Sequence, residues 1–362
     1  MTAVGSYLPA NVVTNEALSS FVDTDDAWIR RRTGIAQRHL VADGETTADL
    51  AYHAASKALA NAGLTGGDID LIIIATTTPD NTFPSTATKL QHMIDAKGAI
   101  AFDIQAVCAG FVYALDVADA MLQSGRGRRA LVVGAESFSK LLDWEDRTTC
   151  VLFGDGAGAV VLELADDAGD DAGDWGIRSS VLHSDGAYRD ILYVDGGPSS
   201  NAAVGHVRME GKEVFRHAVE KLASVMDEAL SAANMQAGDI DWLVPHQANV
   251  RIIDAMQKKM DLPSDRVVRT VEQHANTSAA SIGKSHDGRP NFTNTAPQTS
   301  PPPMASIAKT SPFLIRPSST AALSASGIDA ADVLACCSTV RTTRSDGKSI
   351  FFCMASMMRT LA

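Results

Sequence analysis

The stretch AIAFDIQAVCAGFVYALDVADAML, residues 99–122, passes from an apolar run directly into a helical pattern and places Cys108 at the junction. The second part repeats apolar residues at the spacing of an amphipathic helix, namely Phe111, Ala114, Leu115, Ala118 and Leu122. A strand that leads into a helix is the repeating unit of α/β folds. Cys108 has two interpretations, because free cysteine is often a small buried hydrophobe and a thiol at a helix start is a potential nucleophile.

Three further apolar runs have the length and composition of buried strands. They are LIIIATT (71–77), ALVVGAE (130–136) and GAGAVVLEL (156–164). An amphipathic helical pattern, TTADLAYHAASKALANAG (46–63), precedes the first of them. Continuous apolar strands that alternate with amphipathic helices predict an α/β architecture in which helices cover both faces of each sheet.

A similar order of elements resumes after an acidic segment, ELADDAGDDAGDWG (163–176). The elements predicted there are strands over 175–185, 239–247 and 265–273 and helices over 211–234 and 249–260. We therefore predict two halves that weakly echo each other, residues 1–165 and 176–282. A solvated acidic linker over residues 166–175 would join them.

Composition restricts the class of protein. The 362 residues are 45% hydrophobic and 20% charged, and the formal net charge of −12 argues against a nucleic-acid partner. The five cysteines form no CxxC pair and no metal-ligand spacing. The sequence shows no signal-peptide pattern and no apolar run long enough to span a bilayer. We therefore expect a cytoplasmic protein with no membrane segment and no metal.

Composition and patterning change near Gly283. Residues 283–362 contain 7 of the 13 prolines and have a charge balance of +4, against −16 for residues 1–282. Weakly patterned sequence rich in proline, serine and threonine predicts loops or disorder. A short helix over 321–335 and an apolar segment over 349–358 do not continue the earlier order of elements. We therefore interpret residues 283–362 as an atypical tail, frame-shifted or foreign.

Three polar residues lie where predicted strands end. Cys108 begins a helix, where unpaired N–H groups and the positive dipole end are expected to lower the pKa of its thiol. His246 ends a strand, and Asn276 lies between a strand and a helix start. Because ligands collect at the carboxyl ends of strands, we predict one shared pocket. Taken singly, His246 could be structural, Asn276 a helix N-cap, and His274 an alternative base.

Four motifs together carry a resemblance to a known family: DIQAVCAGFVYAL, FGDGAGAVVL, LVPHQANVRII and HANTSAASI. The shorter segments GSYLP, DAWIRRRTGI and FPSTATKLQ fit the same pattern. Over roughly residues 3–282 the sequence resembles β-ketoacyl-[acyl-carrier-protein] synthase III, a family of condensing enzymes with the thiolase fold. The resemblance implies two pseudo-repeated βαβαβαββ halves packed as α-β-α-β-α layers.

The resemblance implies a catalytic triad of Cys108, His246 and Asn276. Cys108 would take the acyl group of acetyl-CoA, or of another short acyl-CoA, as a thioester. His246 and Asn276 would stabilise the negative charge that develops when malonyl-acyl-carrier-protein loses carbon dioxide. The product would be a β-ketoacyl-acyl-carrier-protein that initiates fatty-acid synthesis. This chemistry requires no cofactor.

The resemblance also implies a tunnel for CoA. Trp28 would stack on the adenine, Arg147 would pack on the other face of the adenine, and Arg32 would bind phosphate. The residues that would line the pantetheine channel are Gly211, Phe215, Asn249 and Arg251. Without the resemblance, Trp28 would be interpreted as a partly buried aromatic and the arginines as surface charges.

Two contacts with other chains are implied as well. Lys212, Arg216 and Arg251 would offer positive charge to the acidic acyl carrier protein, although the chain as a whole is negative. Phe83 would reach the acyl pocket of the neighbouring subunit in a homodimer and limit the length of the acyl chain.

After Ile282 the sequence departs from the family, whose members continue through a helix and two strands joined by a Gly-rich turn. The tail glycines, at 283, 288, 327 and 347, are all isolated. We therefore expect an incomplete second half, and a disabled, non-catalytic remnant as the alternative function unless the tail supplies substitute strands. A degradative thiolase is a weaker alternative, because Cys336, Cys337 and Cys353 lack the Gly-rich setting of that family's second cysteine. A hydrolytic Cys-His enzyme is weaker still, since only the residue types support it.

Overall fold

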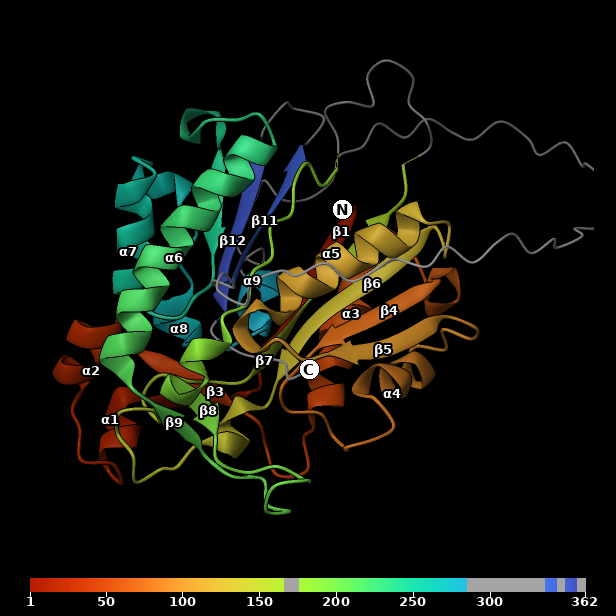
Figure 1. Ribbon diagram of the computed structural model, residues 1–362. Coiled ribbons are helices and arrows are strands. Elements are labelled where there is room, and N and C mark those ends of the chain that lie inside the picture. Colours follow the sequence, from red (N-terminus) through yellow and green to blue (C-terminus); the bar gives the residue numbers. More distant parts are fainter. Residues whose placement is uncertain (166–175, 285–335, 344–348, 357–362) are drawn as a thin grey trace, which may run out of the picture. The chain divides into compact units, whose positions relative to one another are not determined.

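A five-stranded sheet organises the N-terminal half in the computed structural model, which describes residues 1–165, 176–284, 336–343 and 349–356 (Figure 1). The strand order is β1-β7-β6-β4-β5. The strand β4 runs parallel to β5 and β6, and β7 runs antiparallel to both β1 and β6. The bounds are Ala3–Tyr7 for β1, Leu71–Ala75 for β4, Ile100–Ile104 for β5, Arg129–Glu136 for β6 and Gly156–Glu163 for β7.

The strand β4 explains why these strands are apolar along their whole length. All five of its residues are buried. Leu71 and Ile73 face the cluster that contains the apolar side of α5, whereas Ile72 and Ile74 face the cluster built by α3 and α4. Helices therefore cover both faces of the sheet, as predicted. Their bounds are Thr47–Ala62 for α3, Thr86–Met93 for α4 and Gly110–Gln123 for α5.

The second sheet corrects the expectation of two missing strands. Its order is β10-β12-β11, with β12 parallel to β10 and antiparallel to β11. The bounds are Trp242–Pro245 for β10, Cys336–Thr343 for β11 and Ser349–Ser356 for β12. The tail thus supplies two strands to this sheet, β12 beside β10 and β11 beside β12, because pairing of backbone N–H and C=O groups requires little of the sequence beyond extended segments.

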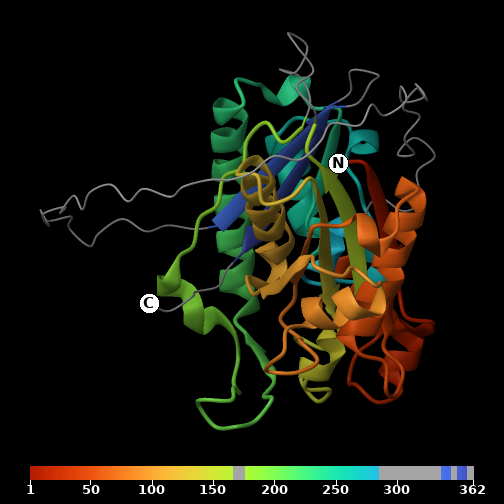
Figure 2. The same cartoon turned by 90° about the vertical axis from the view of Figure 1, so that its right-hand side faces the viewer.

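Adjacent residues of β10 show how the layers follow one another. Leu243 belongs to the cluster formed with α6 and α7, whereas Val244 belongs to the cluster formed with α5 and α9. Helices α5 and α9 therefore lie between the two sheets, and the predicted α-β-α-β-α order is confirmed (Figure 2). The bounds are Gly211–Ala232 for α6, Val250–Lys259 for α7 and Ala280–Lys284 for α9.

Two predicted strands are wrong. Residues 176–185 contain no regular strand, because no neighbouring strand among the described residues pairs with them. In the region 265–273 only Val267 pairs, in one parallel bridge with Leu243, and a short helix follows. The other elements are β2 Asn11–Thr14, β3 Gln37–Leu40, β8 Leu192–Val194, β9 Val207–Met209, α1 Asn15–Ser19, α2 Asp26–Thr33 and α8 Val271–His274.

Some predictions fall on residues outside the described ranges. These are the acidic linker over 166–175, the short helix over 321–335 and most of the tail after Lys284. Within the described ranges, no helix combines the length and the apolar character needed to cross a membrane.

Glycines allow the backbone of the α9 region to contact the first sheet directly. A Cβ atom on Gly134 in β6 would lie 2.4 Å from the Ala279 carbonyl oxygen. A Cβ atom on Gly283 would lie 2.8 Å from the carbonyl carbon of Gly158 in β7. Any side chain at these positions would collide with backbone atoms, which cannot rotate away.

Replacing Gly134 by alanine is expected to lower the free energy of unfolding by about 2–3 kcal/mol, because the methyl group would force β6 away from Ala279. Urea denaturation of the purified variant measures this change. Gly238→Ala is the matched control, because a Cβ atom there would meet no atom within 4 Å. Equal stability of the two variants would contradict the close contact.

Candidate active site

One cavity of about 690 Å³ contains all three predicted triad residues in its wall. Cys108 reaches it from the first half of the chain, and His246 and Asn276 reach it from the second half. The structure therefore places the three residues in the wall of one cavity. His274, the alternative base, is not among the residues that line this cavity.

Cys108 lies in a 3-10 turn, Val107–Ala109, immediately before α5. Burial raises the pKa of the Cys108 thiol to about 12, and the neighbouring Glu136 contributes in the same direction. The expectation that the helix start lowers this pKa is wrong, because the loss of solvent at the cavity wall outweighs the favourable dipole. The resting residue is therefore a thiol.

His246 follows β10 and is almost fully buried. Its Nδ1 atom lies 2.6 Å from the Ser281 hydroxyl oxygen. Burial lowers the pKa of His246 to about 4, so that the imidazole is neutral at pH 7. In the tautomer in which Nδ1 accepts the Ser281 hydroxyl proton, the neutral ring carries its own proton on Nε2 and is a donor there.

Asn276 is held in place by its backbone N–H and by the oxygen of its side-chain amide. Its N–H donates to the Leu152 carbonyl at 3.0 Å, and its Oδ1 accepts the Ser278 N–H at 2.9 Å. It is not the N-cap of α9, which begins at Ala280. Because Oδ1 is occupied, the Nδ2 group is the part of the amide that remains to donate to a bound molecule.

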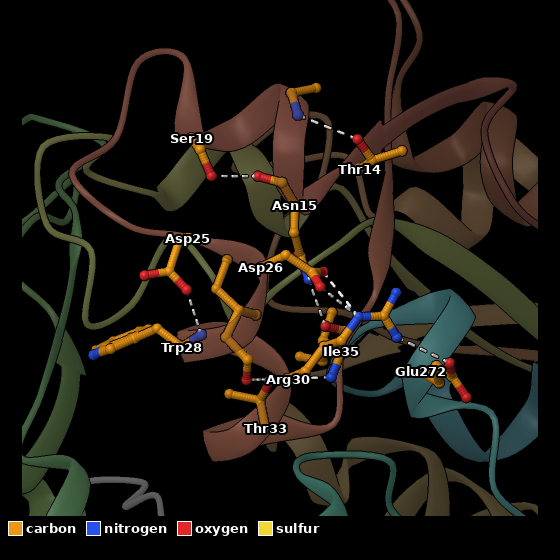
Figure 3. Close-up of polar contacts among 12 residues, drawn as sticks. Thr14, Asn15, Ser19, Asp25, Asp26, Trp28, Arg30, Thr33, Ile35 and Glu272 are labelled. Atoms are coloured by element: carbon orange, nitrogen blue, oxygen red, sulfur yellow. Dashed lines mark hydrogen bonds and ion pairs between the residues drawn. The ribbon is translucent and has the colours of Figure 1, made fainter.

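Trp28 is placed by the polar contacts of α2 (Figure 3). The Trp28 N–H donates to the Asp25 carboxylate at 2.7 Å, which caps the helix. Asp26 accepts from the Asn15 amide at 2.8 Å and from Arg30, and Arg30 also reaches Glu272 at 3.2 Å. The helix that carries Trp28 is thereby tied to α1 and α8.

Two guanidinium groups lie over the Trp28 ring. Arg32 is 4.2 Å from the ring centroid and Arg147 is 5.5 Å away. Trp28 and Arg32 line the cavity, whereas Arg147 does not and donates to the Asp23 carbonyl at 2.8 Å. The structure thus brings together the aromatic ring and the cations that the sequence predicts for the mouth of the tunnel.

The predicted channel residues Gly211, Phe215, Asn249 and Arg251 all line the cavity, and so does Lys212. Arg251 lies over the Phe215 ring, 5.2 Å from its centroid. Asn249 also caps α7, and its Nδ2 donates to the Arg32 carbonyl at 3.0 Å. The predicted docking residue Arg216 is not in the cavity wall and pairs with Glu213.

Two residues that line a small cavity next to Cys108, Phe138 and Phe153, were not predicted from the sequence. A second, very small cavity of about 10 Å³ adjoins Cys108 and is bounded by the stacked rings of Phe138 and Phe153, 4.3 Å apart. Phe83, the one residue predicted for the acyl pocket, lies outside both cavities and is 83% exposed. The signal that could have identified Phe153 is its position in the FGDGAGAVVL motif.

The described side chains that line this site do not form a cluster of metal ligands. In the ranges that the structure describes, no three His, Cys, Asp or Glu side chains gather as metal ligands would. A thiol beside two uncharged donors in an apolar cavity can form and break a thioester and can hold a developing oxyanion.

Comparison with protein-family models gives two matches. A model described as 3-Oxoacyl-[acyl-carrier-protein (ACP)] synthase III matches residues 102–186, and the model of the C-terminal part of that enzyme matches residues 230–285. The first contains Cys108, and the second contains His246 and Asn276.

Individual relatives agree with these matches. The β-ketoacyl-[acyl-carrier-protein] synthase III of Paramagnetospirillum magneticum is 62% identical over 278 residues, which are 77% of this chain and 86% of the relative. The same enzyme from Rhodospirillum rubrum is 60% identical over 279 residues, again 77% and 86%. The crystal structure of 3-oxoacyl-[acyl-carrier-protein] synthase III from Aquifex aeolicus superposes with a TM-score of 0.73 and 43% identity, covering 78% of this chain and 87% of that one.

Proposed function

Because the chain belongs to the β-ketoacyl-[acyl-carrier-protein] synthase III family of condensing acyltransferases, we propose that it joins acetyl-CoA to malonyl-acyl-carrier-protein and so initiates fatty-acid synthesis. The observation that carries the proposal is the single cavity that joins Cys108, His246 and Asn276 to Trp28. The same cavity offers an aromatic ring for the adenine and a thiol for the thioester of one bound CoA.

The first step is acyl transfer. The Cys108 sulfur attacks the thioester carbonyl, its S–H bond breaks, and CoA leaves as the acyl group becomes a thioester of the enzyme. The small cavity behind Cys108, closed by Phe138 and Phe153, supports a short acyl group. We therefore favour acetyl over longer acyl chains.

The second step is decarboxylative condensation. Malonyl-acyl-carrier-protein loses carbon dioxide, and negative charge develops on the oxygen of its thioester. His246 donates from Nε2 and Asn276 from Nδ2 to this oxygen, since Ser281 and Ser278 occupy the other atom of each group. The resulting carbanion attacks the acyl-Cys108 carbonyl, the C–S bond breaks, and the Cys108 thiolate that leaves takes a proton from solvent to restore the thiol.

Lys212, Arg216 and Arg251 form the surface that we assign to the acyl carrier protein. They lie in the N-terminal turns of α6 and α7, and Lys212 and Arg251 line the cavity. Their positive charge suits the acidic partner. The exposed ring of Phe83 supports a homodimer in which it covers the partner's acyl pocket.

The alternative of a disabled remnant is not favoured. Relatives about 60% identical to this chain bear the name of the condensing enzyme, and β12 and β11 extend the sheet outward from β10.

Intact-protein mass spectrometry after incubation with acetyl-CoA tests the proposal directly. We expect one acetyl adduct per chain, and the formation of acetoacetyl-acyl-carrier-protein when malonyl-acyl-carrier-protein is added. A chain that stays unmodified at saturating acetyl-CoA would overturn the proposed function.

Trp28→Ala is expected to raise the KM for acetyl-CoA about tenfold or more with little change in kcat, because stacking on a base is worth about 1–3 kcal/mol. Steady-state kinetics measure the two constants separately. The KM for malonyl-acyl-carrier-protein is an internal control, since that substrate has no adenine. An unchanged KM for acetyl-CoA would show that the adenine does not bind at Trp28.

A further inference from the structure

Gln247 is a buried polar side chain that the mechanism above does not use. It follows His246 directly after β10 and is fully buried. Its Nε2 group donates to the Pro245 carbonyl at 2.8 Å and to the Val268 carbonyl at 3.1 Å. Both N–H donors of the amide are therefore used, one at the end of β10 and one on the chain segment that faces it.

The oxygen of the same amide holds the start of α8. Gln247 Oε1 accepts the Thr270 N–H at 2.8 Å and the Val271 N–H at 3.2 Å. N–H groups at the start of a helix have no partner within it. The four contacts also fix the orientation of the amide, because two carbonyls require its nitrogen and two N–H groups require its oxygen. Gln247 thus joins the end of β10 to residues 268–271 through every polar atom of its side chain.

The segment that Gln247 holds leads through α8 to Asn276. Between them Ala275 has a φ of 56°, a conformation that residues with a side chain rarely adopt. Such a conformation persists only where the surrounding structure holds the chain firmly. Beyond Asn276, the Ser281 hydroxyl oxygen returns to His246 Nδ1 at 2.6 Å. Asn276 is thereby held between two contacts, one with Gln247 and one with His246.

We propose that Gln247 sets the position of Asn276 relative to His246, so that their two donors meet on one oxygen of the malonyl thioester. This inference rests on the proposed function, because that oxygen belongs to the proposed substrate. Gln247 is not among the residues that line the cavity. It is therefore a positioning residue, which acts through the backbone segments that it joins.

The contacts of Gln247 predict an effect on one step of the reaction. Condensation needs both oxyanion donors at once, whereas acylation needs the Cys108 thiol and the CoA site. Cys108 is placed by the turn before α5 and Trp28 by α2, and the four partners of the Gln247 amide lie on neither element. A displaced Asn276 should therefore slow condensation and leave acylation almost unchanged.

Gln247→Glu is the test, with the rate of condensation measured between pH 6 and pH 8. The carboxylate keeps an acceptor for the start of α8, but its second oxygen would face the carbonyls of Pro245 and Val268 and repel them. We expect kcat for condensation to fall about thirtyfold at pH 8, with single-turnover acylation of Cys108 close to the wild-type rate. Protonation of the carboxyl group restores a donor, and burial raises its pKa, so the loss should shrink as the pH falls.

Gln247→Met separates the hydrogen bonds from the charge. Methionine keeps the length of the side chain, adds no charge and removes all four contacts. Condensation should again fall far more than acylation, but by the same factor at every pH. If Gln247→Glu does not fold, Gln247→Met tests the selective loss of condensation by itself.

Gln257→Glu is the matched control. The Gln257 amide also bonds a backbone carbonyl, that of Leu262 at 3.0 Å, and its oxygen accepts from Arg269, which can pair with a carboxylate. Gln257 does not line the cavity. The control should condense at the wild-type rate throughout the pH range.

Other titratable groups near Gln247 are shared by the variants and the wild type. His246 directly precedes it, and the chain that faces it carries Arg269, Glu272 and His274. The ratio of the variant rate to the wild-type rate at each pH therefore reports the introduced carboxyl group.

Several outcomes overturn the proposal. They are a variant that condenses at the wild-type rate at pH 8, a loss shared in the same proportion by acylation and condensation, and a loss in Gln247→Glu that is the same at every pH. Failure of both variants to fold also overturns it, because Gln247 would then only stabilise the fold. A wild-type chain without condensing activity would instead refute the proposed function itself.

Discussion

Cys108→Ala is expected to abolish acetylation of the chain and to lower the rate of condensation by roughly four orders of magnitude or more. Alanine removes the sulfur, and with it the covalent intermediate that divides the reaction into two steps. Decarboxylation of malonyl-acyl-carrier-protein should persist, because His246 and Asn276 line the cavity independently of the thiol. Mass spectrometry and product assays measure these effects.

Cys150→Ala is the control for this prediction. Cys150 is also a free cysteine, but it is fully buried and does not line the cavity. The control should acetylate as the wild type does. Acetylation that persisted in Cys108→Ala and disappeared in Cys150→Ala would show that the wrong thiol has been assigned.

Asn276→Asp is expected to reduce the rate of condensation by about two to three orders of magnitude. Aspartate keeps the oxygen that accepts the Ser278 N–H, but it replaces the Nδ2 donor by an oxygen that repels the developing negative charge. Acylation of Cys108 should change far less. Single-turnover acylation and steady-state condensation separate the two steps.

Asn61→Asp provides the same substitution at an exposed amide whose contact is the Val4 carbonyl, 2.8 Å away. It should retain the wild-type rate of condensation. A rate in Asn276→Asp within a few-fold of this control would remove Asn276 from the oxyanion site.

The sequence predicts the fold best where local pattern and burial agree. The run over 71–77 is apolar because β4 is covered on both faces, and the helix over 46–63 is real because Thr46 and Asp49 cap one end and Gly63 the other. The predictions failed where the structure depends on which strands pair with one another. Nothing in the residues of 176–185 says that none of the strands in the described ranges pairs with them. Nor does the composition after Gly283 say that one segment pairs with β10 and a second segment pairs with the first.

The positions of the candidate site residues could be predicted, but their ionisation could not. The ends of the predicted strands and the motifs indicated that Cys108, His246 and Asn276 lie near one another, and all three line one cavity. The pKa of Cys108 depends on how much solvent the fold removes, and that quantity is a property of the packed structure.

The backbone contacts at Gly134 and Gly283 limit how this enzyme can change in laboratory evolution. We expect the substrate range to be adjustable at Phe138 and Phe153, which line the small cavity beside Cys108 and can be exchanged for smaller side chains. At Gly134 and Gly283 an added side chain would collide with main-chain atoms. A second substitution elsewhere cannot remove main-chain atoms, so it cannot relieve this collision. The packing between the two halves, which positions Asn276 relative to Cys108, should therefore stay unchanged while the residues that line the pocket vary.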